Sequence, residues 1–120
     1  MEDEEKVYPD LNEKEGLERF MGNDALYKKY LEDFLYDASF IEFCTGVEMG
    51  DMGMADKALY TLMGSSSNLS LERLFHATHD AAQGIAAGMH DEELEDLVQE
   101  VNEAYAMACD AVRNYLMSQE

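Results

Sequence analysis

Proline, cysteine and basic residues are scarce in this chain of 120 residues. The single proline, Pro9, leaves the rest of the chain without the residue that interrupts helices most strongly. No segment alternates apolar and polar residues between turn signals, as a half-buried strand would. The two cysteines, Cys44 and Cys109, lack CxxC spacing and each falls in an apolar helical pattern, which excludes a disulfide-rich scaffold. We therefore expect a helical chain with buried free thiols, typical of a reducing cytoplasm.

Basic residues are outnumbered by acidic ones, with 8 Lys and Arg against 27 Asp and Glu, which gives a formal charge of −19. So acidic a chain repels nucleic acid and anionic lipid surfaces, and neither is an expected partner. No apolar run approaches the roughly 18 residues that indicate a membrane-spanning helix, and the first residues are acidic, unlike a signal peptide. We expect a cytoplasmic protein without a membrane segment.

Apolar spacing and capping residues predict five helices. We expect them from Asn12 to about Gly22, from Asn23 or Asp24 to about Gly50, from about Met54 to Leu69, from a cap at Ser70 to about Gly88, and from Asp91 onward. Residues 1–11 are acidic and poor in core-forming side chains, so they are predicted to be a flexible lead-in to a single domain over residues 12–120. The economical fold is all-α, an antiparallel four-helix bundle with an additional short N-terminal helix.

The same spacing predicts which side chains face the core. On the second helix these are Leu26, Tyr30, Phe34 and Ile41, and on the third they are Ala55, Leu59, Leu62, Ser66 and Leu69. The last helix is the clearest amphipathic one, with an apolar series at Leu94, Leu97, Val98, Val101, Tyr105, Ala108, Val112 and Leu116. His90, at the turn before it, is predicted to be a cap or loop residue.

Three segments of the chain are similar to one known family. Residues 59–69 read Leu-Tyr-Thr-Leu-Met-Gly-Ser-Ser-Ser-Asn-Leu, and they follow an entry segment at 16–27 and a helical segment at 31–38. Together these segments resemble histidine phosphotransfer (HPt) domains, over about residues 16–116. In that family the central helix reads His-x-Leu-Lys-Gly, followed by small residues and an aliphatic-Gly pair. The resemblance implies a helical-bundle module of a two-component phosphorelay.

The chain departs from the family pattern at the residues that carry the chemistry. Tyr60 stands at the His position, Met63 at the Lys position, and Ser70 where the pattern has Gly. Phosphoryl transfer from an aspartyl phosphate needs an exposed nitrogen nucleophile and a nearby cation. A phenol forms a stable ester instead of a high-energy phosphoramidate, and Asp56 adds a negative charge that only Lys57 could offset. We therefore expect no phosphotransfer at Tyr60, no enzyme activity and no cofactor.

The substituted surface could still bind a partner. Tyr60, Met63, Gly64, Ser67 and Lys57 are predicted to form an exposed docking patch, with apolar residues at its centre and polar ones at its rim. The resemblance implies that its partner is the receiver domain of a response regulator or hybrid histidine kinase, bound by a monomer of this chain. The plainer interpretation is that Tyr60 is a half-buried aromatic of a helical bundle.

Two other functions remain open from the sequence. An active phosphotransfer protein could use a displaced phosphoacceptor, His76 or His79, although neither has the flanking Leu-Lys-Gly pattern. Glu72, His76 and His79 share one helical face that could hold a divalent ion weakly, but a solvated polar stripe is the commoner outcome, and no metal site is predicted. A generic adaptor could instead bind its partner through its acidic outer surface.

Overall fold

A computed structural model describes residues 7–119, which form six α-helices and no strand. In chain order these are α1 (Glu13–Arg19), α2 (Asp24–Leu35), α3 (Ser39–Met49), α4 (Met52–Leu69), α5 (Glu72–Ala86) and α6 (Asp91–Ser118). The all-α class predicted from the sequence is confirmed. Among the described residues, no helix is long and apolar enough to cross a membrane.

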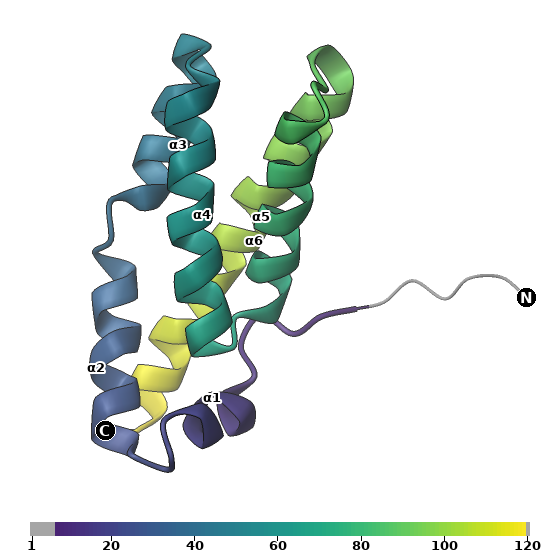
Figure 1. Ribbon diagram of the computed structural model, residues 1–120. Coiled ribbons are helices and arrows are strands. Elements are labelled where there is room, and N and C mark those ends of the chain that lie inside the picture. The colour runs from purple at the N-terminus through teal and green to yellow at the C-terminus, as the bar shows by residue number, and fades with distance from the viewer. Residues whose placement is uncertain (1–6, 120) are drawn as a thin grey trace, which may run out of the picture.

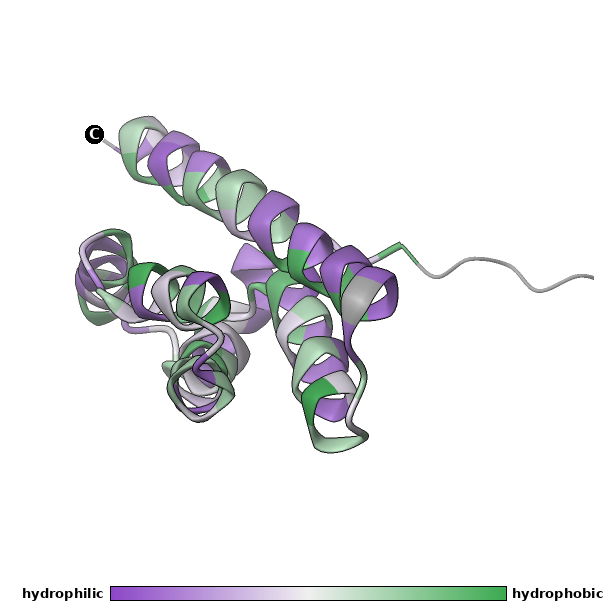
Figure 2. Cartoon of the chain, turned by 90° about the horizontal axis from the view of Figure 1, so that it is seen from above, coloured by the Kyte–Doolittle hydropathy of each residue, from purple (hydrophilic) through white to green (hydrophobic). Residues whose placement is uncertain are grey.

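Helix α4 is at the centre of the helix packing. Helix α4 lies between α3 and α5, α5 packs on α6, and α2 contacts both α4 and α6 near the end of the molecule where α1 lies (Figure 1). Seen from above, α6 runs obliquely across the other helices (Figure 2). The described helices therefore form a bundle whose core is shared by α2 to α6, with large buried side chains at Tyr27, Leu31, Phe43, Leu59, Leu62, Leu74, Val101 and Val112.

The sequence pattern predicted one continuous second helix up to about Gly50, and this prediction is wrong. Residues 36–38 interrupt it, and the Asp37 carboxylate accepts a hydrogen bond from the backbone N–H of Ser39 at 2.7 Å where α3 begins. An Asp side chain that bonds to the backbone two residues on favours a turn over a continuous helix.

The break also changes which side chains of this region are buried. Leu26, Tyr30 and Ile41, predicted to face the core, are 39%, 44% and 67% exposed, whereas Phe34 is buried as predicted. The buried residues of α2 are instead Tyr27, Leu31 and Phe34, and those of α3 are Ser39, Phe43 and Gly46. A single apolar series drawn through both helices therefore placed Phe34 correctly and misplaced the other three residues.

The turns on either side of α4 differ in how well they were predicted. Gly50 ends α3 in the left-handed region with φ 73°, as expected of this turn, and the Asp51 side chain accepts from the N–H of Met54, so α4 begins at Met52.

Ser70 does not cap α5 with its side chain, contrary to the prediction. It ends α4 in the left-handed region with φ 63°, and Leu71 occupies the position before α5. His90 stands at the position before α6, with extended backbone, as predicted.

Part of the expected flexible lead-in, residues 1–6, lies outside the described residues. The following segment lies against α5. The carbonyl of Pro9 accepts from the N–H of Arg73 at 3.0 Å, the Asp10 carboxylate lies 3.9 Å from the Arg73 guanidinium, and Leu11 packs on the core.

Both cysteines are free thiols, but they are not equally buried. Cys109 is buried as predicted, whereas Cys44 is only half-buried, because α3 leaves it at the edge of the contact with α6. Burial raises the pKa of both thiols, so neither favours the reactive thiolate form.

Candidate functional site

The orientation of α4 is set by a buried, mainly apolar seam. Ala55, Leu59, Leu62, Ser66 and Leu69 are all buried, as predicted from their spacing. The one polar member, Ser66, donates its hydroxyl proton to the carbonyl of Leu62 at 2.7 Å, so no hydroxyl is left unpaired in the core. A helix held along this seam must turn the residues between these positions outward.

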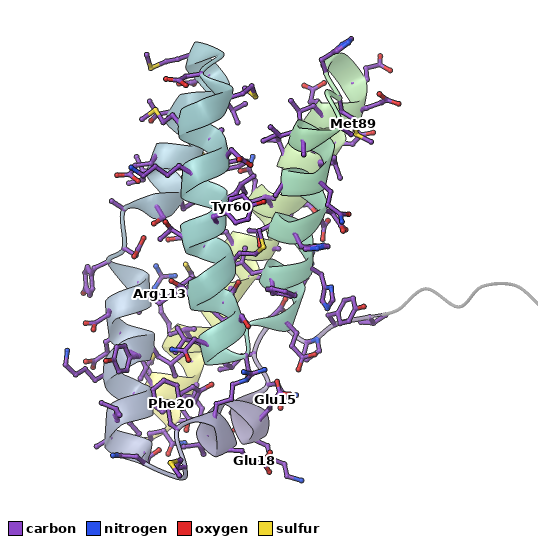
Figure 3. All side chains as sticks on the ribbon, viewed as in Figure 1. Glu15, Glu18, Phe20, Tyr60, Met89 and Arg113 are labelled. Carbon is purple, nitrogen blue, oxygen red and sulfur yellow. The ribbon has the colours of Figure 1, made fainter. Side chains whose placement is uncertain are left out.

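Tyr60 is among the side chains turned outward. It is 60% exposed and lies near the middle of α4 (Figure 3), so more of its side chain faces solvent than the interpretation as a half-buried aromatic expected. Lys57 and Gly64 are also exposed, one turn before and one turn after it. These three residues share a face of α4, since positions three and four apart are neighbours on a helix surface.

The other two candidate residues lie at the edges of this face. Met63 is half-buried and packs against the core. Ser67 is half-buried in a hollow of about 250 Å³, lined also by Glu15, Arg19 and Ser70. The five candidate residues therefore form a stripe along α4, but only Lys57, Tyr60 and Gly64 are fully presented to solvent.

Gly64 has no packing role in the described chain. A Cβ atom built on it would meet no heavy atom within 4 Å, whereas one on Gly46 would collide with the backbone of α4 and one on Gly16 with the ring of Tyr27. Glycine inside a helix costs about 0.5–1 kcal/mol relative to alanine. At Gly46 and Gly16 close packing explains the residue, and at Gly64 it does not.

Two charged residues lie close to Tyr60 on α4, one basic and one acidic. Lys57 is the single basic residue of α4, and Asp56 precedes it. No side-chain ion pair joins Lys57 to a described residue, and the backbone carbonyl of Lys57 accepts from the Thr61 hydroxyl at 3.4 Å. The carbon and sulfur side chain of Met63 offers no cation in the place where the HPt pattern has one.

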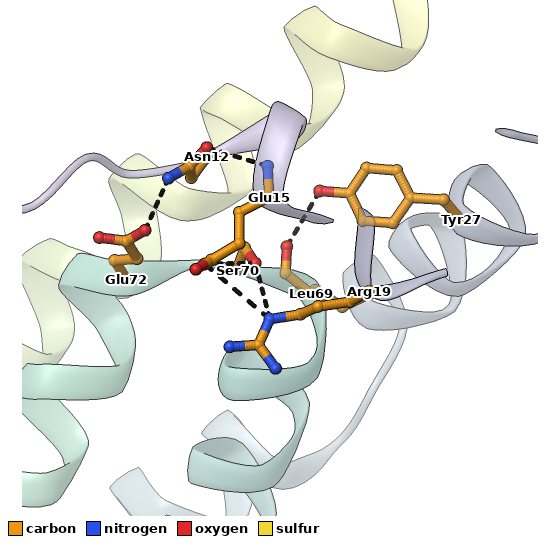
Figure 4. A network of polar contacts seen from close by, with 7 residues as sticks. All are labelled: Asn12, Glu15, Arg19, Tyr27, Leu69, Ser70 and Glu72. Atoms are coloured by element: carbon orange, nitrogen blue, oxygen red, sulfur yellow. Dashed lines mark hydrogen bonds and ion pairs between the residues drawn. The ribbon is translucent and has the colours of Figure 1, made fainter. Parts of the chain in front are cut away.

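A polar network that sequence reasoning missed lies at the end of α4 (Figure 4). The Ser70 hydroxyl donates to Glu15 at 2.9 Å and accepts from the Arg19 Nε at 3.2 Å, and the Tyr27 hydroxyl donates to the carbonyl of Leu69 at 2.9 Å. These contacts hold α1 and α2 against the end of the helix that carries Tyr60. These residues are more than 40 positions apart in the sequence and meet only because the helices pack together. No local sequence pattern could therefore have revealed these contacts.

The histidines of α5 are engaged with their surroundings. The ring of His76 stacks on Tyr8 with centroids 3.6 Å apart, and His79 lies 3.8 Å from the Asp80 carboxylate. Glu72 accepts from the Asn12 side-chain amide at 2.8 Å. Over residues 7–119, no three His, Cys, Asp or Glu side chains are grouped so that they could hold a metal ion.

Comparisons were made with protein-family models, curated proteins and solved structures, and none of them matches the chain.

Proposed function

We propose that this chain is a non-catalytic module with an HPt-like antiparallel four-helix fold, which binds the receiver domain of a response regulator or hybrid histidine kinase through the α4 face around Tyr60. It transfers no phosphoryl group, and it acts in the cytoplasm, where the free thiols of Cys44 and Cys109 would persist. The resemblance of residues 59–69 to the HPt phosphoacceptor segment supports the class of partner.

One observation carries the proposal, namely the open space beside an exposed tyrosine. Tyr60 is 60% exposed, and Gly64, one turn further along α4, leaves the space next to it empty at a cost to helix stability. A partner that packs close to the backbone of α4 would use that space. Tyr and Met are residues that commonly anchor protein interfaces.

The chemistry of the same residues supports binding without transfer. A phosphorelay needs a reversible phosphoramidate on histidine, which a tyrosine phenol cannot form. His76 and His79 have the nitrogen that a phosphoramidate needs, but Tyr8 stacks on one face of the His76 ring and His79 has an acidic neighbour, Asp80, which disfavours the approach of a phosphoryl group.

Binding can be tested by capture of receiver domains from a panel of purified response regulators and hybrid kinases. The wild-type chain is expected to retain at least one receiver domain, and Tyr60→Glu is expected to lose it, because a carboxylate replaces the apolar anchor. Tyr36→Glu is the matched control, since Tyr36 is also exposed, at 88%, but lines the hollow between α2 and α6. Equal retention by both variants would contradict docking at Tyr60.

Substitution of Gly64 by alanine should change stability and receiver affinity in opposite directions. Gly64→Ala is expected to raise the free energy of unfolding by about 0.5–1 kcal/mol, because the space is open and alanine favours the helix. The same change should weaken receiver binding, because it fills the space beside Tyr60. Urea denaturation and titration of the captured receiver measure the two effects. A more stable variant with unchanged affinity would show that the partner does not approach Gly64.

Transfer can be tested by restoring the HPt pattern. A receiver carrying an aspartyl phosphate is expected to leave the wild-type chain unlabelled and to give acid-labile phosphate on the double variant Tyr60→His, Met63→Lys. Labelling of the wild type that is lost in His76→Gln or His79→Gln would instead establish the displaced phosphoacceptor. If the double variant takes no label from a receiver that it binds, the HPt-like geometry of α4 is refuted.

A further inference from the structure

A groove lies between the tip of the α3–α4 pair and the first half of α6. The α3–α4 pair and the α5–α6 pair diverge toward their tips (Figure 1), and the groove has a volume of about 800 Å³. Its apolar lining is Val47 and Met52 on one side and Leu94 and Val98 on the other, and Glu92 and Glu95 stand at its rim. None of the five residues of the Tyr60 patch lines it.

The lower end of the groove is closed by direct contacts between α3 and α6. The rings of Phe40 and Tyr105 are stacked with centroids 3.9 Å apart, and the Cys44 thiol donates to the Asn102 side chain at 3.9 Å. Beyond these contacts the groove opens, with Val47 of α3 and Leu94 and Val98 of α6 among its lining residues.

One apolar series on α6 is covered along only part of its length. Val101, Ala108 and Val112 are completely buried, whereas Leu94 and Val98 are half-buried, although all belong to the same predicted stripe. Leu94 and Val98 are therefore apolar side chains of this stripe that the core leaves accessible from the groove. The residues from Glu92 to Asn102 span about 15 Å of helix, which matches about three turns of a second helix laid alongside.

The charge around the groove is of one sign. Residues 30–56 and 74–112, which supply all of its lining, contain no lysine or arginine. An apolar floor with an acidic rim complements a helix that presents aliphatic side chains flanked by Lys and Arg. A second copy of this chain is a poor occupant, because each copy carries a charge of −19.

We infer that this groove binds a basic amphipathic helix of a partner protein, at a second docking surface separate from the Tyr60 face. The aliphatic side chains of that helix contact Val98, Leu94 and Met52, and its basic side chains pair with Glu92 and Glu95. This inference does not depend on receiver binding, and a module with both surfaces can hold two proteins at once.

The inference can be tested with labelled synthetic peptides of about 14 residues, long enough for about four helical turns. One carries leucines along one helical face flanked by lysines, a second has glutamate at every lysine, and a third is a scramble of the first without an amphipathic face. Fluorescence anisotropy is expected to show binding of the first alone, weakened by a rise from about 50 to 500 mM salt. Equal binding of the scramble would overturn the inference.

Variants of α6 locate the bound peptide. Leu94→Glu is expected to weaken binding at least about ten-fold, since Leu94 is in the groove but outside the buried core. Met107→Glu is the matched control, because it adds the same charge to an exposed position on the other side of the same helix. Circular dichroism checks the fold of both. An equal loss of peptide affinity in both variants would show general electrostatic repulsion and would contradict binding in the groove.

A charge reversal tests the rim without touching the apolar floor. Glu92→Lys with Glu95→Lys should weaken binding of the basic peptide at least about ten-fold, and both residues are exposed, so the fold should be unaffected. Tyr60→Glu should leave the peptide affinity unchanged, which distinguishes this surface from receiver docking. Peptide binding that is lost in Tyr60→Glu but kept in Leu94→Glu would place the peptide on α4 and overturn the inference.

Discussion

Ser70 shows how one buried side chain offsets the strain of its own backbone. Its φ of 63° lies in the left-handed region, where the Cβ atom of an L-residue costs about 1–2 kcal/mol, and it is 2% exposed. The HPt pattern has glycine at this position, which would adopt the conformation freely. Serine provides instead a hydroxyl that bonds to Glu15 and Arg19 and so connects α1 to the end of α4.

The two contributions of Ser70 can be separated by two substitutions. Ser70→Ala keeps the strain and loses both hydrogen bonds, so the free energy of unfolding should fall by about 1–2 kcal/mol. Ser70→Gly loses the same bonds but relieves the strain, and its stability should stay close to that of the wild type. Urea denaturation of the three proteins measures the difference. If the glycine variant is as unstable as the alanine variant, the backbone at this turn is not strained.

The break between α2 and α3 decides how the first half of the bundle is built. A helix continued through residues 36–38 would carry α3 away from α4, whereas the break lets Gly46 approach the α4 backbone at Ala55 and Phe40 stack on Tyr105. The hydrogen bond from the Ser39 N–H to the Asp37 carboxylate is the local interaction that favours this break.

Substitution of Asp37 tests that local interaction. Asp37→Ala is expected to lower the free energy of unfolding by about 1 kcal/mol, because it removes the acceptor of the turn hydrogen bond before α3. Asp37→Asn retains an oxygen acceptor and should keep most of the stability. The midpoint of chemical denaturation measures both. An asparagine variant that loses as much as the alanine variant would show that the negative charge at the start of α3 matters, and not the acceptor.

At the scale of the whole molecule, two tyrosine hydroxyls and one buried thiol make stability depend on pH. Each is protonated at neutral pH, which favours the folded state. Burial is the largest cause that raises the pKa of Tyr27, Tyr105 and Cys109 above their ordinary values. In the unfolded chain these groups lose their protons near their ordinary pKa values, about 8.5 for the thiol and about 10 for the phenols. Their contribution to stability is therefore complete below about pH 8 and is lost as the pH rises through this range.

Alkaline pH should unfold the chain for this reason. The urea midpoint is expected to fall steadily between about pH 8 and 11. Tyr27→Phe removes one buried phenol, so its urea midpoint should fall less steeply with pH. The variant also loses the hydrogen bond to Leu69, so it should be less stable than the wild type at neutral pH. Tyr36→Phe, at an 88% exposed position, should follow the wild-type decline. Parallel declines of all three proteins would contradict a role for buried Tyr27.

Local patterns along the chain were enough to predict the helical class, the buried seam of α4 and the shared face of Lys57, Tyr60 and Gly64. Helical periodicity and the turn at Gly50 depend on neighbours within a few positions of the chain, so a local pattern suffices to predict them. The same spacing placed Lys57, Tyr60 and Gly64 on one face, and the exposure of all three agrees with it.

Which helix faces became covered depended on how the helices pack against one another. Tyr27 replaced Leu26 and Tyr30 in the core because its ring fits beside Gly16 and its hydroxyl reaches Leu69, 42 positions away. The half-burial of Met63 and the uncovered part of α6 at Leu94 follow from the positions of neighbouring helices. Burial is a property of the neighbours that a residue acquires on folding, and a pattern along one helix carries no information on where the others end.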